Sequence, residues 1–171
     1  MLKSEIAPKL LPFLTTTKSL TKKLENLSKK PLIVKVLSQK SRLLTLTEKK
    51  MCQLPLHRPI LVWERKVLLF GDNPPSQMLG HQTSNQNAWI EATSLFPYNS
   101  LLGKNKRLKH LKNTPIGYIL FKKNKELPFK RQFIILPHHI SRQTVYQLNH
   151  KPIIIEEIFL PAFLDFLLQN H

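Results

Sequence analysis

Apolar residues recur along the chain with two spacings, one typical of helices and one typical of strands. Between residues 19 and 29, Leu20, Leu24 and Leu27 follow the i, i+4, i+7 spacing of a helix face, with lysines on several of the other positions. Residues 161–169 can close as a second helix, because a helix tolerates their initial proline in its first turn. We therefore predict two helices that place an apolar face against a core.

Shorter apolar runs bounded by turn residues predict about six strands, at residues 32–37, 59–71, 88–96, 129–136, 142–148 and 152–160. The last three are joined by short connectors, which favour antiparallel neighbours. Residues 71–87 are rich in turn formers and predict a long loop, whereas 41–58 are ambiguous between a loop and a short helix. The pattern predicts an α+β fold with one mostly antiparallel sheet and helices packed on it.

Alternation of side chains along 59–71 places Arg65 inside the protein. Every other residue on its face of the strand is apolar: Leu61, Trp63, Val67 and Leu69. Glu64 and Lys66 fall on the other face and are expected to point to water. A guanidinium keeps its charge when it is buried, so Arg65 needs a carboxylate or carbonyl partner.

Two further arginines have similar positions. Arg131 shares its face of a strand with apolar residues, and Arg142 shares its face with Thr144 and Tyr146. Half of the six arginines of the chain are therefore expected on faces that look toward a core or a cleft.

The most apolar strand, 152–160, contains two adjacent carboxylates. Alternation sends Glu156 to one face and Glu157 to the other, but both faces are equally apolar, so periodicity does not decide which one points inward. The inward glutamate has two interpretations. It either forms an internal pair with an arginine that fixes the sheet, or it handles a proton or hydroxyl in a closed pocket where an arginine binds a ligand carboxylate. Arg65, which points inward on its own strand, is the expected counterpart of this inward glutamate.

Composition adds a strong positive charge. The 171 residues include 27 Lys and Arg against 10 Asp and Glu, giving a net charge of +17, which suggests an anionic partner. Most of these basic residues are lysines, and an AT-rich genome also enriches lysine on solvated protein surfaces. We therefore expect no nucleic-acid partner, and keep a basic nucleic-acid-binding protein as an alternative function. No apolar run is long enough to span a membrane. The single cysteine, Cys52, excludes an internal disulfide, and no pattern of metal ligands is found.

Three segments resemble the chorismate lyase family in sequence and in order. They are "WERKVLLFGDNPP…AWIEATSLFP", "LKNTPIGYILF" and "NHKPIIIEEIFLPA". The resemblance covers roughly residues 17 to 163. The chain is similar in particular to the chorismate-lyase-like proteins of red-algal plastid genomes. It implies a single domain over residues 1–171, with 1–16 as a loose N-terminal segment. The implied fold is one antiparallel sheet of about six strands with helices on one side and flaps over a buried site.

The resemblance also implies a reaction and a set of site residues. The reaction is the elimination of pyruvate from chorismate, without metal or cofactor, to give 4-hydroxybenzoate for quinone biosynthesis. The family's ligand arginine and glutamate match Arg65 and Glu157, so the resemblance selects Glu157 over its neighbour. Main-chain contacts with the substrate match Leu20 and Ile116. A soluble monomer in the plastid is implied, with the bacterial cytoplasm as the alternative location.

The chain departs from the family at two places. A second arginine of many bacterial members is replaced by Thr93, and a W-G-R-R-S segment is reduced to "ISRQT", which keeps Arg142. We therefore add Arg131 and Arg142 to the expected substrate-binding residues, as sources of positive charge. A non-catalytic relative that binds a small aromatic acid is the second interpretation.

Overall fold

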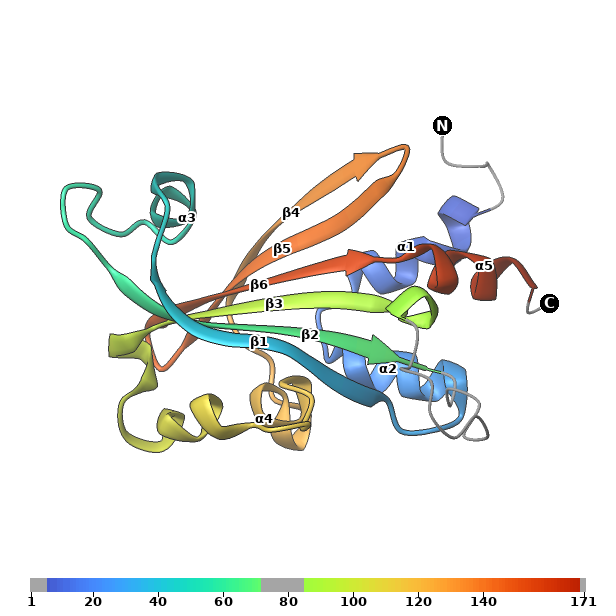
Figure 1. Ribbon diagram of the computed structural model, residues 1–171, viewed down its shortest axis with the longest axis horizontal. Helices are drawn as coiled ribbons and strands as arrows, with labels where there is room; N and C mark the ends of the chain where they lie inside the picture. Colours follow the sequence, from blue (N-terminus) through green and yellow to red (C-terminus); the bar gives the residue numbers. More distant parts are fainter. Residues whose placement is uncertain (1–5, 72–84, 170–171) are drawn as a thin grey trace.

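The computed structural model describes residues 6–71 and 85–169, which form one open sheet with helices on both faces (Figure 1). The α-helices are α1 (Ile6–Thr15), α2 (Leu20–Ser28), α3 (Leu46–Met51), α4 (Gly117–Leu120) and α5 (Pro161–Gln169). The strands are β1 (Ile33–Leu43), β2 (Leu61–Phe70), β3 (Ile90–Pro97), β4 (Phe129–Leu136), β5 (His139–Leu148) and β6 (Lys151–Phe159). Short 3₁₀ helices are η1 (Asn85–Asn87), η2 (Tyr98–Leu101), η3 (Gly103–His110) and η4 (Lys122–Asn124). The predicted α+β class is confirmed.

The six strands have the order β1-β2-β3-β6-β5-β4, and every neighbouring pair is antiparallel. The tight connection between β5 and β6 uses Asn149 and His150, both at positive φ (52° and 62°), which is the backbone of a hairpin turn that follows the twist of the strands. β3 and β6 are distant in sequence but adjacent in the sheet, so the last three strands extend the sheet formed by the first three.

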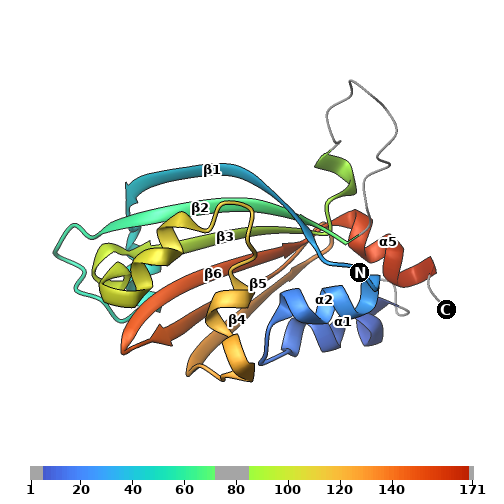
Figure 2. The same cartoon turned by 90° about the horizontal axis from the view of Figure 1, so that it is seen from below.

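One face of the sheet carries Arg65 and is covered by α1, α2, α4 and α5; we call it the arginine face (Figure 2). At one end of it, Leu10, Leu24 and Phe163 from three different helices are fully buried against the central strands. At the other end, residues from the segment 98–127 pack on Tyr146 and Ile153. Two apolar clusters therefore lie on the arginine face, and the polar residues of that face lie at the boundary between them.

Helix α1 occupies most of the segment for which we predicted a loose N-terminus. It buries Ile6, Leu10, Phe13 and Leu14, and the last three belong to the core. A proline, Pro12, lies inside this helix, which is why the sequence did not suggest it. The segment 6–15 is thus an ordered part of the arginine face; the prediction of a single domain over residues 1–171 stays a prediction.

The opposite face of the sheet, which we call the α3 face, also carries a helix, which differs from the prediction. Helix α3 packs there, over Val62, Leu95 and Ile154, so the helices are not all on one side of the sheet. Its first turn is fixed by a capping box between Thr45 and Glu48.

The expectation that Glu64 points to water is wrong. Glu64 is 4% exposed, because α3 and the side chain of Arg42 cover it.

The predicted strands and the two predicted helices are all present, with shifted bounds. β1 continues past the predicted end at residue 37, and β5 begins before residue 142. Most of the predicted loop 71–87 lies outside the described residues. Among the residues that the structure describes, no helix is long and apolar enough to cross a membrane.

Candidate active site

Arg65 lies on β2 with 1% of its surface exposed, on the face that the sequence predicts. Its Nη2 donates to the carbonyl oxygens of Lys112 (2.7 Å) and Thr114 (3.2 Å). No ion pair with a carboxylate forms among the described residues, and its Nε has no hydrogen-bond partner among them. Desolvation lowers the pKa of Arg65 to about 10. The chain therefore buries a cation here without neutralising it.

Glu157 also points to the arginine face, but its partner is not Arg65. Arg142 lies directly opposite Glu157 in the register of β5 and β6, and its Nε donates to Oε2 of Glu157 at 2.5 Å. Arg142 is 1% exposed, and its Nη1 also donates to the carbonyl oxygens of Phe13 and Leu14 at 2.9 and 3.2 Å. The expectation that Arg65 is the counterpart of the inward glutamate is therefore corrected.

Glu156, by contrast, points to the α3 face and is partly exposed there. It accepts a hydrogen bond from Nε2 of Gln143 at 3.2 Å. The two adjacent glutamates thus have different surroundings, as alternation requires.

Arg131 is the third arginine of this face. It donates to Oγ1 of Thr144 (2.8 Å), to the carbonyl oxygen of Thr16 (2.7 Å) and to the hydroxyl of Tyr146 (3.1 Å). Desolvation, and then the nearby charge of Arg142, lower the pKa of Arg131. Burial likewise raises the pKa of Tyr146, so the phenol is a neutral partner for the guanidinium.

The register of the sheet brings these residues into two adjacent rows. Arg65, Ser94, Ile155, Thr144 and Arg131 are paired in this order across five strands. Neighbouring strands lie about 4.8 Å apart, so Arg131, four strands from Arg65, has its Cα roughly 19 Å away along the row. Between the two arginines stand two small hydroxyl side chains and one isoleucine.

The second row contains Ala92, Glu157 and Arg142, again paired across neighbouring strands. Arg142 is three strands from the position of Arg65, a separation of roughly 14 Å. Among the described residues, the three arginines contact one carboxylate, that of Glu157. The cluster thus carries two uncompensated positive charges at opposite ends of a floor of Ser94, Ile155 and Thr144, an arrangement suited to an elongated dianion.

Two segments of the chain cover the cluster, and the arginines donate hydrogen bonds to main-chain carbonyl oxygens of both segments. Arg65 binds the segment that enters α4, and Arg131 and Arg142 bind the segment that enters α2. Leu20 and Ile116, the expected main-chain contacts, lie at the starts of these two helices. α2 and α4 lie along the same face of the sheet and contact each other (Figure 1).

The contact between α2 and α4 depends on Gly117. A Cβ at this position would lie 2.6 Å from Oγ of Ser19 and 2.8 Å from Oγ1 of Thr21. Glycine is therefore required for the two helices to approach this closely. Ser19, whose side chain accepts from the N–H of Lys22, also caps α2.

The structure also shows where Thr93, which replaces an arginine of many bacterial family members, is placed. In the register, Thr93 pairs with Lys66 and Glu156, so its side chain points to the α3 face. Its neighbours Ala92 and Ser94 face the arginines instead. The replacement of an arginine at this position therefore removes no charge from the cluster around Arg65.

Trp63 is a site residue that the sequence did not single out. It shares the face of Arg65 on β2, and its indole Nε1 is buried without a hydrogen-bond partner among the described residues. A buried donor without a partner costs about 1–3 kcal/mol, and here it stands two positions from the unpartnered Nε of Arg65. The only signal in the sequence was its place on the same strand face as Arg65.

Cys52, in contrast, lies on the α3 face and is buried there. Desolvation raises the pKa of its thiol to about 11, so the thiol stays protonated and has no part in this site.

Comparisons with known proteins show the family of the chain. The family model described as "Chorismate lyase" matches residues 3–165. The chain belongs to the chorismate lyase family. A relative named "Probable chorismate pyruvate-lyase" from Psychrobacter arcticus is 39% identical over 92% of this chain and 89% of its own length. Relatives of the same name from Psychrobacter cryohalolentis and Acinetobacter baumannii are 37% and 31% identical, over 91% and 96% of this chain and 88% of each relative.

Proposed function

We propose that the chain is a chorismate pyruvate-lyase, which eliminates pyruvate from chorismate and forms 4-hydroxybenzoate. The family supports this assignment, and the observation that carries it is the cluster of three arginines, two of them buried, with one carboxylate. Chorismate is an elongated dianion with a ring carboxylate and an enolpyruvyl carboxylate. Two uncompensated cations at opposite ends of the cluster match these two charges.

Each residue of the cluster has a role in this proposal. Arg65 binds the ring carboxylate, because its Nε is free to donate and its charge has no partner. Arg142 and Arg131 face the enolpyruvyl carboxylate, and the main chain at Leu20 and Ile116 closes over the substrate. The proposal puts the ring above Ser94 and Ala92, whose side chains are small and lie on the arginine face.

Glu157 acts on the proton that must leave. The carboxylate takes the proton from the ring carbon that bears the hydroxyl group, and the electron pair of the broken C–H bond moves into the ring. The C–O bond to the neighbouring carbon then breaks, and enolpyruvate leaves and becomes pyruvate on protonation. The ring becomes aromatic, which drives the step, so a modest base suffices. The reaction is redox-neutral, and the proposal assigns it no cofactor and no metal.

The finer parts of the sequence-based assignment remain proposals. 4-Hydroxybenzoate is a head-group precursor for prenylated quinones, and we propose this use for the product. The relatives named above come from bacteria, which supports the bacterial cytoplasm as the location. The red-algal plastid origin rests on the resemblance in sequence, with which the lysine- and asparagine-rich composition agrees, and the monomeric state stays a prediction for size-exclusion chromatography.

One assay tests the proposed function. Purified protein is mixed with chorismate, and pyruvate is measured with lactate dehydrogenase while 4-hydroxybenzoate is measured by liquid chromatography. We expect the two products in equal amounts. Binding of 4-hydroxybenzoate without release of pyruvate would instead identify a non-catalytic relative.

A further inference from the structure

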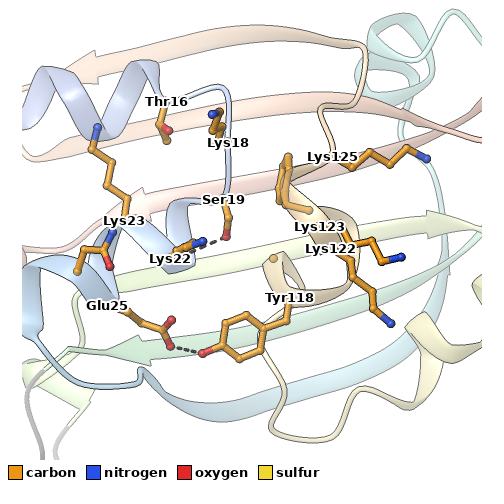
Figure 3. Close-up of a pocket in the computed structure, with 13 residues that line it drawn as sticks. Thr16, Lys18, Ser19, Lys22, Lys23, Glu25, Tyr118, Lys122, Lys123 and Lys125 are labelled. Atoms are coloured by element: carbon orange, nitrogen blue, oxygen red, sulfur yellow. Dashed lines mark hydrogen bonds between the residues drawn. The ribbon is translucent and has the colours of Figure 1, made fainter.

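A lysine-lined groove opens on the outer side of the helices that cover the arginines. Its volume is about 880 Å³, and it lies between the start of α2 and the segment of α4 and η4 (Figure 3). The groove does not include the arginines themselves. Its volume is in the range of sites for small molecules rather than of a surface dimple.

The charge of the groove is strongly one-sided. Six lysines line it from both walls: Lys18, Lys22, Lys23, Lys122, Lys123 and Lys125. The one carboxylate in the lining, Glu25, is already engaged, because it accepts from the N–H of Leu32 and from the hydroxyl of Tyr118. Figure 3 shows the ring of Tyr118 reaching across the groove to Glu25.

Most of these lysines have no partner that would explain their position. Lys23 donates to the carbonyl oxygen of Pro12, and the other five form no ion pair with any carboxylate of the residues described. All five are exposed. Bringing so many like charges around one hollow is unfavourable, and an anion in the hollow would relieve that repulsion.

The groove is separated from the arginine cluster by a single layer of chain. Thr16 lines the groove, and its carbonyl oxygen accepts from Arg131 and Arg142. Gly117 lines it as well, three residues after Thr114, whose carbonyl oxygen accepts from Arg65. An anion in the groove therefore lies next to both segments that cover the cluster.

We propose that the lysine-lined groove is a capture site that collects the dianionic substrate from solution before it passes the segments that cover the arginines. This inference rests on the proposed function. A small dicarboxylate fits the groove better than a nucleic acid does, because the groove lies beside the segments that cover the cluster and contains no arginine. The electrostatic field of clustered like charges raises the association rates of oppositely charged ligands by factors of about 10 to 10³, and salt weakens it.

The test compares two variants with the same loss of charge. The groove variant carries Lys18→Gln, Lys22→Gln, Lys122→Gln, Lys123→Gln and Lys125→Gln. The control variant replaces five exposed lysines outside the groove with glutamine: Lys50, Lys104, Lys106, Lys130 and Lys151. The association rate constant of chorismate is measured by rapid mixing, from tryptophan fluorescence, at low and at high ionic strength.

At low ionic strength we expect the association rate constant to fall about tenfold in the groove variant and less than about threefold in the control. The difference should vanish at about 0.5 M salt. An equal fall in both variants would overturn the inference. So would a groove variant that loses binding of a single-stranded oligonucleotide but not of chorismate. Because association is measured before the chemical step, failure of pyruvate release in the wild type would count against the proposed function and not against the groove.

Discussion

Arg42 on the α3 face and Arg65 on the arginine face have opposite kinds of partner. On the α3 face, Arg42 forms two hydrogen bonds of 2.8 Å with Glu48 and one of 2.5 Å with Glu64. On the arginine face, Arg65 is more deeply buried and has only carbonyl partners. The pKa of Arg42 is raised, chiefly by its bond with Glu48, whereas desolvation lowers that of Arg65.

The contrast separates a structural arginine from one held for a ligand. A buried charge that only stabilises the fold is normally neutralised within the protein, as it is at Arg42. Arg65 is destabilising unless an anion from outside supplies the missing charge. The same sheet thus shows, on its two faces, a complete ion-pair network and an incomplete one.

The largest effect is expected when Arg65 is replaced. Arg65→Gln should lower kcat/KM for pyruvate release about 10³-fold, because two charge-assisted hydrogen bonds to the ring carboxylate are lost. Arg42→Gln should change it less than about threefold, since it lies on the other face. Comparable losses in both variants, measured with the pyruvate assay, would remove the distinction between the faces.

The adjacent glutamates provide the next test. Glu157→Gln should lower kcat about 10²-fold or more, because an amide does not accept the proton. Glu156→Gln, with the same change of charge one residue away on the α3 face, should remain close to the wild type. A Glu157→Gln enzyme with a near-normal kcat would exclude this residue as the base.

The free energy of unfolding should depend more on Arg42 than on Arg65, which is the reverse of the order expected for activity. Arg42→Gln leaves Glu64 buried without its main partner, so we expect the free energy of unfolding to fall by about 3 kcal/mol. Arg65→Met removes a desolvated charge that no carboxylate compensates, and should change it by less than about 1 kcal/mol. Urea unfolding followed by circular dichroism measures both values, and a larger loss at Arg65 than at Arg42 is incompatible with the comparison.

The smallest effect is a dependence of stability on pH that arises on the α3 face. Burial alone would raise the pKa of Glu48, but its hydrogen bonds with Arg42 and with the N–H of Thr45 outweigh burial and lower it. The unfolded chain then binds more protons than the folded one, so this stabilisation is complete above the ordinary value of 4.5 and is lost as the pH falls through the lower folded pKa. Unfolding of Glu48→Gln between pH 3 and 6 should show a flatter profile than the wild type.

The sequence predicted the strands and the direction of Arg65, because alternation against an apolar face is a local signal. It missed the burial of Glu64, because β2 is covered on both faces and α3 comes from a stretch without clear periodicity. It also gave Glu157 the wrong partner. The choice between Arg65 and Arg142 depends on the order of β6 and β5 in the sheet, which the chain does not encode locally.

The partners of the three arginines were also beyond prediction. Most of them are carbonyl oxygens, those of Phe13, Leu14, Thr16, Lys112 and Thr114, and a main-chain oxygen leaves no trace in side-chain identity. The role of Gly117 was likewise hidden, since it depends on the approach of a distant helix.

The central claim is that the uncompensated charge of Arg65 is held for an anionic ligand. The most direct measurement is isothermal titration of 4-hydroxybenzoate into the wild type, Arg65→Gln and Arg42→Gln, because it needs no turnover. We predict that Kd rises at least about 30-fold in Arg65→Gln, the loss of one hydrogen-bonded ion pair, and is unchanged in Arg42→Gln. Equal affinity of all three proteins for 4-hydroxybenzoate would contradict the account.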